Sequence, residues 1–151
     1  MPAGSKPLTP AQAIDLCAEA IGKRESEVGA FVTLDLDGAR KAAEQPGLKA
    51  KPLRGLPIAL KDIFDTADMP TEYGSPIYKG HKPASDASLV SLVRRAGGVV
   101  LGKTVTTEFA YFQPGKTRNP HGSRHTPGGS SSGSAAAVAD FMVPLAFGSQ
   151  T

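Results

Sequence analysis

The sequence predicts an α/β fold in which helices cover a central sheet, and three observations carry that prediction. Short apolar runs that are typical of buried strands occupy residues 56–64, 99–101 and 143–147. Segments with helical periodicity alternate with these runs, which favours parallel pairing for at least part of the sheet. The 151 residues are 40% hydrophobic and 21% charged, so one domain can bury a core of its own.

The first helix is predicted to begin at Pro10. Thr9, Pro10 and Gln12 stand in the order of a capping box with a proline in the first turn. Gly22 is the expected end of this helix, since glycine tolerates the left-handed backbone of a helix terminus. The buried face is expected to consist of residues three or four apart, namely Ile14, Cys17, Ala18 and Ile21.

A second helix is expected after a cap near Asp37 and should end before residue 46. Because both predicted helices fall within residues 1–50, we expect that region to be a helical lead-in to residues 51–151. A third helix, capped by Ser85 or Asp86, is predicted between the first two strands. Its buried stripe is expected to comprise Leu89, Leu92, Val93 and Ala96.

Composition argues against several classes of protein. The net charge of +3 is scattered, with no arginine-rich run or interleaved aromatic residues, so nucleic acid is not an expected partner. The single cysteine, Cys17, can form no intramolecular disulfide, which makes the cytoplasm the expected location. No apolar span is long enough to cross a membrane, and no basic-then-apolar leader is present, so neither a membrane span nor a secretory signal is expected.

Residues 126–137 combine glycines and hydroxyl groups ahead of a stretch that favours helix. Gly128 and Gly129 permit a close approach to the backbone, and a helix that begins near Ser134 would direct free N–H groups toward the loop. An anionic or oxyanionic group is the natural guest of such a loop. A flexible linker is the alternative, but the apolar residues that follow directly favour a site.

Lys61 interrupts the most apolar of the predicted strands. An ionised ammonium is costly to bury, so the site must either supply a counter-charge or lower the lysine pKa. A neutral lysine can serve as a base toward a serine of the 130–132 run. Alternatively, Lys61 lies at the strand end and reaches solvent, or pairs with Asp62 or Asp65. In a regular strand Lys61 and Asp62 point to opposite faces, which disfavours this nearest carboxylate as a partner.

Five motifs follow one another along the chain: GLPIALKD at 55–62, GKT at 102–104, EFA at 108–110, NP at 119–120 and PGGSSSGSAA at 127–136. With these motifs the chain resembles the amidase signature family, and within it most closely the malonamidase-type enzymes. The resemblance covers the chain from about Gly55 onward, and the N-terminal helices more loosely. It implies the amidase signature fold, a mixed central sheet covered by helices, with residues 51–151 as the N-terminal part of that domain.

The resemblance implies a Ser-cisSer-Lys triad that hydrolyses amides. Lys61 corresponds to the base, and Ser130 to the serine that follows a cis peptide bond and passes protons between Lys61 and the nucleophile. The backbone N–H of Thr151 corresponds to a donor of the oxyanion hole. Because the family's nucleophilic serine falls just beyond Thr151, we expect the chain to be an N-terminal portion that is inactive alone. Positions that contact the substrate or support the site are expected at Gly129, Ser131, Ser149 and Gln150.

The function predicted on this basis is hydrolysis of a small carboxamide by an amidase. The A subunit of a glutamyl-tRNA amidotransferase, which shares these motifs but uses released ammonia to amidate a charged tRNA, is an alternative. A non-catalytic fragment that holds an anion in the glycine-serine loop is an alternative from another class. The expected partners are the small-molecule amide and the remainder of the amidase polypeptide, and a homodimer is left open. No cofactor is expected, nor a metal, because His121 and His125 lack a nearby cysteine or carboxylate.

Overall fold

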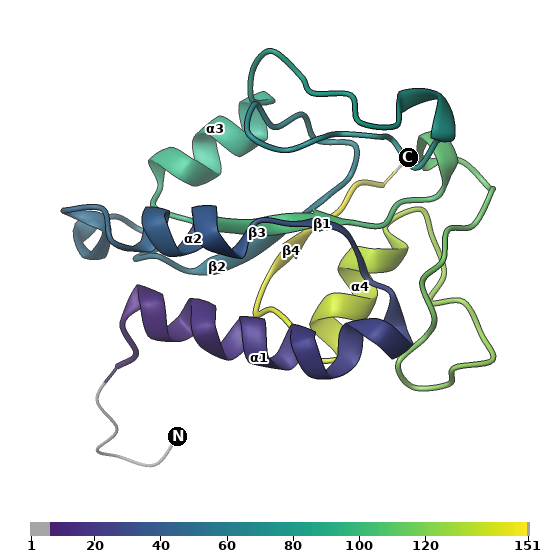
Figure 1. Ribbon diagram of the computed structural model, residues 1–151, viewed down its shortest axis with the longest axis horizontal. Helices are drawn as coiled ribbons and strands as arrows, with labels where there is room; N and C mark the ends of the chain where they lie inside the picture. Colours follow the sequence, from purple (N-terminus) through teal and green to yellow (C-terminus); the bar gives the residue numbers. More distant parts are fainter. Residues whose placement is uncertain (1–6, 151) are drawn as a thin grey trace.

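The computed structural model describes residues 7–150, in which helices pack against a single mixed sheet (Figure 1). The helices are α1 (Pro10–Val28), α2 (Leu36–Ala43), α3 (Ser88–Arg95) and α4 (Ser132–Ala139). The strands are β1 (Phe31–Leu34), β2 (Pro57–Lys61), β3 (Val99–Thr104) and β4 (Ala146–Phe147). Three short 3₁₀ turns, Leu48–Ala50, Pro76–Tyr78 and Glu108–Ala110, lie in the connections.

The strand order in the sheet is β1-β3-β2-β4. The central strand β2 pairs in parallel with β3 on one side and with β4 on the other, whereas β1 pairs antiparallel with β3. This arrangement confirms the predicted α/β class and the mixed sheet. Because β2, β3 and β4 run in the same direction, their carboxyl ends meet at one edge of the sheet.

Helices cover both faces of the sheet (Figure 1). On one face, residues of α1, α2 and α4 pack with Ala59, Val99 and Leu101 in a buried cluster. On the other face, Val90 and Val93 of α3 pack with a second cluster that includes Ile58 and Leu60 of β2. Strand β2 therefore contributes to both clusters by alternation, as expected for a strand that is buried on both faces.

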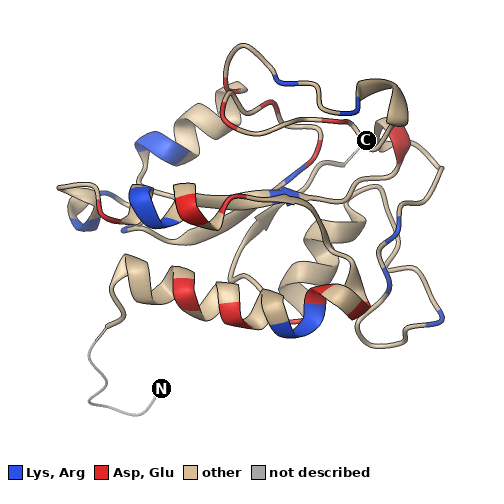
Figure 2. Ribbon diagram, viewed as in Figure 1, with Lys and Arg blue, Asp and Glu red and all other residues tan. Residues whose placement is uncertain are grey.

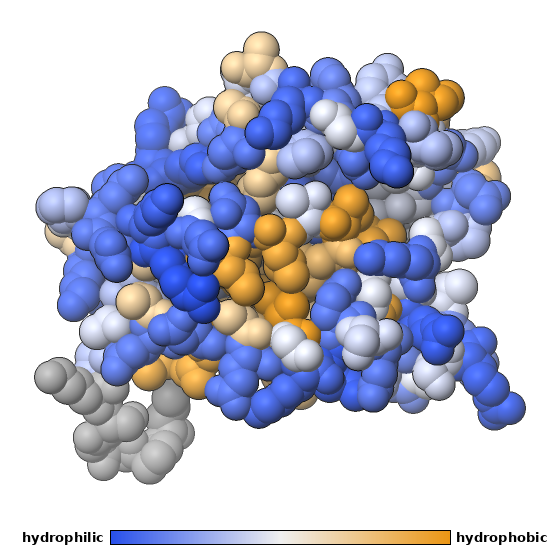
Figure 3. Space-filling view, viewed as in Figure 1, coloured by the Kyte–Doolittle hydropathy of each residue, from blue (hydrophilic) through white to orange (hydrophobic). Residues whose placement is uncertain are grey.

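Strand β1 was not predicted from the sequence. It forms an edge of the sheet within the region that was expected to be a helical lead-in, and the domain boundary near residue 50 stays a prediction. An apolar strip in the middle of one molecular face lies where β1 runs (Figures 1 and 3). Val32 and Leu34 of this strand are each 37% exposed. A four-residue edge strand that is only half covered carries a weak periodic signal, which explains why it was missed.

A β-bulge in β3 changes which face its side chains occupy. Ile58 pairs with Val100, but the next residue, Ala59, pairs with Gly102, so one residue of β3 is skipped. Beyond the bulge, Lys103 lies opposite Leu60 and Thr104 lies opposite Lys61. A Cβ atom on Gly102 would collide with the carbonyl oxygen of Thr33 in β1, so the bulge requires glycine here.

The structure corrects the end of α1 and the N-cap of α2. Helix α1 has the predicted capping box at Thr9, but it continues through Gly22 and ends at Gly29, whose φ is 63°. Helix α2 is capped by Asp35, not Asp37, because the Asp35 carboxylate accepts the Gly38 N–H at 2.9 Å.

In α3, the N-cap is Ala87, not Ser85 or Asp86. Asp86 instead accepts the Ala67 N–H and lies 3.1 Å from Arg94 Nε. The buried positions are Val90 and Val93, whereas Leu92 is 56% exposed. The predicted stripe was right at Val93 and in part at Leu89, which is half-buried and packs against the same cluster, but it was wrong at Leu92. The helix meets the sheet along a face that is slightly rotated from the predicted one.

The predicted apolar runs also have different limits in the structure. The strand expected at 56–64 is confined to Pro57–Lys61, and the one expected at 143–147 to Ala146–Phe147. The strand expected at 99–101 extends to Thr104. Helix α4 begins at Ser132, two residues before the expected start.

Acidic and basic residues are interspersed over the helices and loops (Figure 2). Several of them form exposed pairs within or between helices, such as Arg40 with Asp15 and Asp37. Within residues 7–150, no helix has the length and apolar character to cross a membrane.

Candidate active site

The sequence-predicted residues meet at the carboxyl edge of the parallel strands. Lys61 is the last residue of β2, and Ser149 follows β4 after one intervening glycine. Ser130 lies in the loop that leads into α4, which packs against this part of the sheet. Polar groups at the carboxyl ends of parallel strands commonly form ligand sites, because the connecting loops diverge there.

Lys61 is fully buried, at 0% exposure. Its Nζ lies 2.5 Å from Ser130 Oγ and 2.8 Å from Ser149 Oγ. The alternative in which Lys61 reaches solvent or pairs with Asp62 or Asp65 is therefore wrong, since within residues 7–150 no carboxylate forms an ion pair with it. Burial lowers the pKa of the Lys61 ammonium from its ordinary value of 10.5.

Asp62 points to the opposite face of the sheet, as the alternation along the strand predicted. There its Oδ1 lies 3.0 Å from Nζ of Lys103, and both side chains are fully buried. Lys103 also donates to Thr71 Oγ1 at 2.6 Å, and Asp62 Oδ2 accepts the Glu72 N–H at 3.0 Å. Burial raises the pKa of Asp62 and lowers that of Lys103, and in each case the opposite charge of the partner counteracts the shift. Asp62 is thus committed to a second lysine, which sequence reasoning missed.

The Ser130 loop is held against the sheet through its backbone. The Gly129–Ser130 peptide bond is cis, and Gly128 has a φ of 85°. The Ser130 carbonyl accepts the Thr107 N–H at 3.0 Å, and the Gly133 N–H donates to the Val105 carbonyl at 2.9 Å. A Cβ atom on Gly133 would clash with the backbone of Val105, so glycine lets α4 approach the sheet directly.

Two serines, Ser131 in this loop and Ser134 in α4, form hydrogen bonds to the backbone of residues 147–149. Ser131 Oγ accepts the Ser149 N–H and donates to the Ser149 carbonyl, each at 3.1 Å. Ser134 Oγ donates to the Phe147 carbonyl at 2.9 Å and lies 2.7 Å from Thr104 Oγ1. Strand β4 and helix α4 therefore position Ser149 and Ser130 as one unit beside Lys61.

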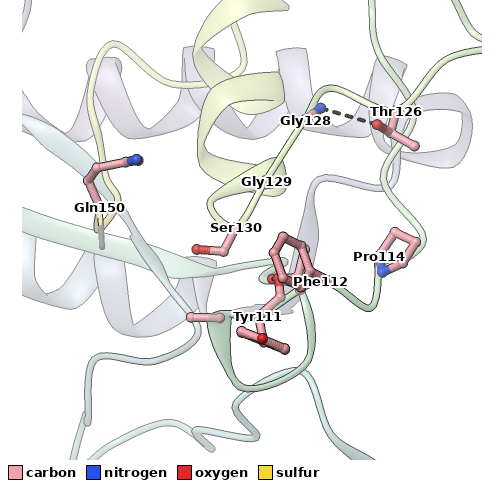
Figure 4. Close-up of a pocket in the computed structure, with 10 residues that line it drawn as sticks. Tyr111, Phe112, Pro114, Thr126, Gly128, Gly129, Ser130 and Gln150 are labelled. Carbon is pink, nitrogen blue, oxygen red and sulfur yellow. Dashed lines mark hydrogen bonds between the residues drawn. The ribbon is translucent and has the colours of Figure 1, made fainter.

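Ser130 lines a cavity of about 520 Å³. In Figure 4, Ser130 lies between Gln150 and the rings of Tyr111 and Phe112. The exposed residues Gly129 and Gln150, both predicted site residues, line this cavity. Tyr111 and Phe112 line it as well and are 73% and 80% exposed, although they were not predicted. Two adjacent aromatic residues directly after the EFA motif were the available signal.

The structure therefore brings together Lys61, Ser130, Ser131 and Ser149, while Gly129 and Gln150 lie at the cavity. Thr151, the predicted oxyanion-hole residue, is outside the described residues. The roles of these residues in catalysis stay predictions. Across residues 7–150, no group of three or more His, Cys, Asp or Glu side chains could hold a metal ion.

Known proteins resemble this chain in both sequence and structure. It is 48% identical to the A subunit of the glutamyl-tRNA(Gln) amidotransferase of Acidothermus cellulolyticus, over 82% of this chain and 27% of that protein. The peptide amidase of Stenotrophomonas maltophilia has a TM-score of 0.84 and 35% identity, covering 92% of this chain and 32% of that one. The A subunit of the glutamyl-tRNA(Gln) amidotransferase of Thermotoga maritima has a TM-score of 0.76 and 34% identity, over 92% and 30%.

These similarities support a family assignment but not the malonamidase type within it. The chain spans about a third of the length of these relatives. None of the three is named as a malonamidase, so they support the broader family resemblance and not the narrower one. The amidase family matches residues 12–151, which is nearly the whole chain, and the chain therefore belongs to the amidase family.

Proposed function

We propose that this chain contributes a lysine-serine proton relay to an enzyme that cleaves amide bonds. One observation carries the proposal: fully buried Lys61, which has no carboxylate partner among residues 7–150, lies 2.5 Å from the Ser130 hydroxyl, beside an open cavity. Burial of such a lysine lowers its pKa and so makes the neutral form, which is a base, easier to reach. The family membership makes amide cleavage the reaction that this base serves.

In the proposed reaction, neutral Lys61 takes the proton of the Ser130 hydroxyl. Ser130 in turn takes the proton of an attacking serine hydroxyl, which lies outside residues 1–151 by the family resemblance. The attacking oxygen forms the bond to the amide carbon, and the proton now held by Lys61 returns through Ser130 to the departing nitrogen. The C–N bond then breaks to leave an acyl-serine and an amine or ammonia, and water completes the cycle by the same relay.

The glycine-serine loop offers less support for a non-catalytic anion site. Its central hydroxyl, Ser130, is directed at Lys61, while the Ser131 hydroxyl is bonded to Ser149 and the Ser134 hydroxyl to Phe147 of β4. A ligand held only by loop N–H groups would not require a buried lysine behind the loop. The relay accounts for both features together.

For the whole protein, we favour the role of the A subunit of a glutamyl-tRNA(Gln) amidotransferase. The curated relatives with 37–48% identity carry that name. In that role the amide-derived ammonia amidates a charged tRNA, which requires further subunits. The basic residues of this chain are too scattered for it to bind the tRNA by itself, so partner subunits would carry that contact.

A stand-alone hydrolase of a small carboxamide, of which the malonamidase type is one example, is the second candidate. Here the supporting observation is structural, because the TM-score with the peptide amidase, 0.84, exceeds the 0.76 with the amidotransferase subunit of Thermotoga maritima. The open cavity beside Tyr111 and Phe112 also suits a small amide that carries an apolar group.

The proton relay is tested by replacing Lys61 with Met and, separately, Ser130 with Ala in the polypeptide that carries this chain and the rest of the amidase sequence. We expect each change to lower kcat for amide cleavage by about 10²–10⁴-fold, the usual contribution of a general base. The exposed Lys49→Met and Ser123→Ala serve as matched controls. Turnover by both active-site variants at the rate of the controls would refute the relay.

The two whole-protein candidates are separated by assaying the same polypeptide with and without the other amidotransferase subunits. The favoured role predicts glutamine-dependent amidation of glutamyl-tRNA(Gln) only when those subunits are present. Efficient hydrolysis of simple carboxamides by the polypeptide alone, together with no tRNA amidation in the complete mixture, would instead establish the stand-alone hydrolase.

A further inference from the structure

Ser149 was expected either to contact the substrate or to support the site, and its polar groups are engaged within the site. Its hydroxyl lies 2.8 Å from Lys61 Nζ. Its backbone N–H and carbonyl are both bonded to the Ser131 hydroxyl, at 3.1 Å each. Ser149 is half-buried and is not among the residues that line the cavity beside Ser130, whereas its neighbour Gln150 is.

The pair of contacts on Lys61 has a chemical consequence. A neutral amine has two N–H bonds and one lone pair, and it can take a proton from Ser130 only if the lone pair points at Ser130 Oγ. An N–H donated to Ser149 Oγ stops the free rotation of the amine about its last carbon bond. With that rotation fixed, the lone pair can be aimed at Ser130, which lies 2.5 Å away.

Ser131 makes this arrangement rigid. Its hydroxyl acts as donor and acceptor to the backbone of the same residue, Ser149, so that residue is held in one orientation. The contact is also tightly packed, because a Cβ atom on Gly148 would approach Ser131 Oγ to 2.7 Å. Ser131 belongs to the same loop as Ser130, so the two groups that face Lys61 are positioned by a common support.

From this geometry we propose that Ser149 is a positioning residue for Lys61, with Ser131 as its support, and not a substrate-binding residue. The proposal rests on the proposed function, since it assigns Ser149 a part in the same proton relay. During the relay one proton passes from Ser130 Oγ to Lys61 Nζ. The ammonium that forms then donates to both hydroxyl oxygens, so Ser149 also stabilises the charged product of that step.

No other charged group acts on Lys61 from the elements around it within residues 7–150. The nearest charges in sequence and along the sheet, Asp62 and Lys103, lie on the opposite face and are paired with each other. Removal of the Ser149 hydroxyl should therefore disfavour the ammonium form, with no nearby carboxylate to compensate. The acidic limb of the pH profile of kcat/KM, which reports protonation of the base, should move to lower pH.

The test compares Ser149→Ala, Ser149→Thr and Ser149→Val in the full polypeptide, with Ser123→Ala as a surface control. Thr keeps the hydroxyl, while Val has nearly the same shape without it. We expect Ala and Val to lower kcat by about 100-fold, as for other small losses of catalytic alignment, with little change in KM. Thr should restore both kcat and the position of the acidic limb. Because Thr and Val have nearly the same shape, a loss of kcat that comes from packing alone would appear equally in both.

Two results overturn the positioning role. One is a raised KM with unchanged kcat and an unmoved acidic limb in Ala and Val, which is the signature of a substrate contact. The other is equal kcat in Thr and Val, whether both are active or both impaired, since the hydroxyl then has no effect. Failure of the proposed function itself looks different, because Lys61→Met and Ser130→Ala would then retain the turnover of the unmodified protein.

Discussion

Two buried lysines stand at the same end of this sheet and differ in their surroundings. Lys61 and Lys103 are both fully buried, and burial lowers the pKa of each. Lys103 faces the carboxylate of Asp62 at 3.0 Å, whereas the polar partners of Lys61 within residues 7–150 are the hydroxyls of Ser130 and Ser149. The comparison separates a lysine whose ammonium form is stabilised by a carboxylate from one for which, among residues 7–150, no carboxylate opposes the effect of burial.

The bulge in β3 creates this difference. If the pairing of Ile58 with Val100 continued without a skipped residue, Lys103 would lie directly opposite Lys61 on the same face. Two ammonium groups would then share one site. The skipped residue moves Lys103 to the face of Asp62 and brings Thr104 beside Lys61 instead. The bulge thus places Lys103, which does no chemistry in the proposed reaction, on the same face of the sheet as the Asp62 carboxylate.

The largest effect is expected when Lys61 is given a carboxylate partner, which removes its difference from Lys103. In Ser149→Asp, the new charge would lie where a hydroxyl now contacts Lys61 Nζ. We expect the pKa of Lys61 to rise and kcat/KM at pH 7 to fall by about 10²–10⁴-fold, because the base stays protonated. The pH profile of the full polypeptide measures this, and its acidic limb should move to higher pH. Full activity at pH 7 would contradict the requirement for a neutral Lys61, and Ser123→Asp controls for the added charge.

Removing the Asp62 carboxylate tests whether Lys103 depends on its partner. Asp62→Asn leaves a buried ammonium without a counter-charge, which should destabilise the fold by about 3–5 kcal/mol. Replacing both partners, as Asp62→Leu with Lys103→Met, should recover most of that loss, because no buried charge is left. Urea unfolding gives the free energies. In comparison, Asp37→Asn removes an exposed partner of Arg40 and should change stability by less than about 1 kcal/mol. If Asp62→Asn changed the free energy of unfolding as little as Asp37→Asn does, the claim that Asp62 stabilises the buried Lys103 ammonium would be contradicted.

The bulge itself is tested by Gly102→Ala. The added methyl group would collide with the Thr33 carbonyl oxygen of β1, so the strands must separate or the bulge must move. We expect a loss of about 1–3 kcal/mol, as for other overpacked sites, and a lower kcat as Lys103 shifts in the sheet. Gly22→Ala, at a glycine of α1 with open space around it and no positive φ, is the control for an added methyl group alone. Wild-type stability and kcat in Gly102→Ala would show that the bulge is not constrained by β1.

The smallest expected effect is a gain in stability. Lys61→Met should stabilise the fold by about 0.5–2 kcal/mol while lowering kcat for amide cleavage as described above, as is usual where an active site holds an unfavourable group. The lowered pKa of Lys61 means that the folded state binds its proton less tightly than the unfolded state does. The gain should therefore be complete below the folded pKa and disappear as the pH rises to the ordinary value of 10.5. Urea unfolding across that pH range measures it, and a gain independent of pH would point to packing alone.

The parts of the molecule with local signals could be predicted from the sequence. The capping box at Thr9 marks the start of α1 correctly, and the apolar run around Ile58 marks β2. Lys61 and Ser130 were singled out by their chemistry and their motifs, and the structure brings them together. In each case the informative residues are neighbours in the chain, so their pattern is visible without the fold.

The features that were missed depend on contacts between distant segments. The Asp62–Lys103 pair forms only because a bulge, set by the approach of β1 to Gly102, changes the side-chain alternation of β3. Helix α1 runs through Gly22 because its buried face continues to Val28, and packing outweighs the weak helix propensity of one glycine. The contact of Ser149 with Lys61 joins residues 88 positions apart, and no local pattern encodes it.

The most direct test of the account is a pH titration of the Lys61 side chain by NMR, on the chain labelled with ¹³C at lysine Cε and with Lys61→Arg to assign the signal. We predict a midpoint below the ordinary lysine value of 10.5, because burial without a carboxylate disfavours the ammonium. A midpoint at or above 10.5 would mean that Lys61 is held in its charged form, and the proposed base would be contradicted.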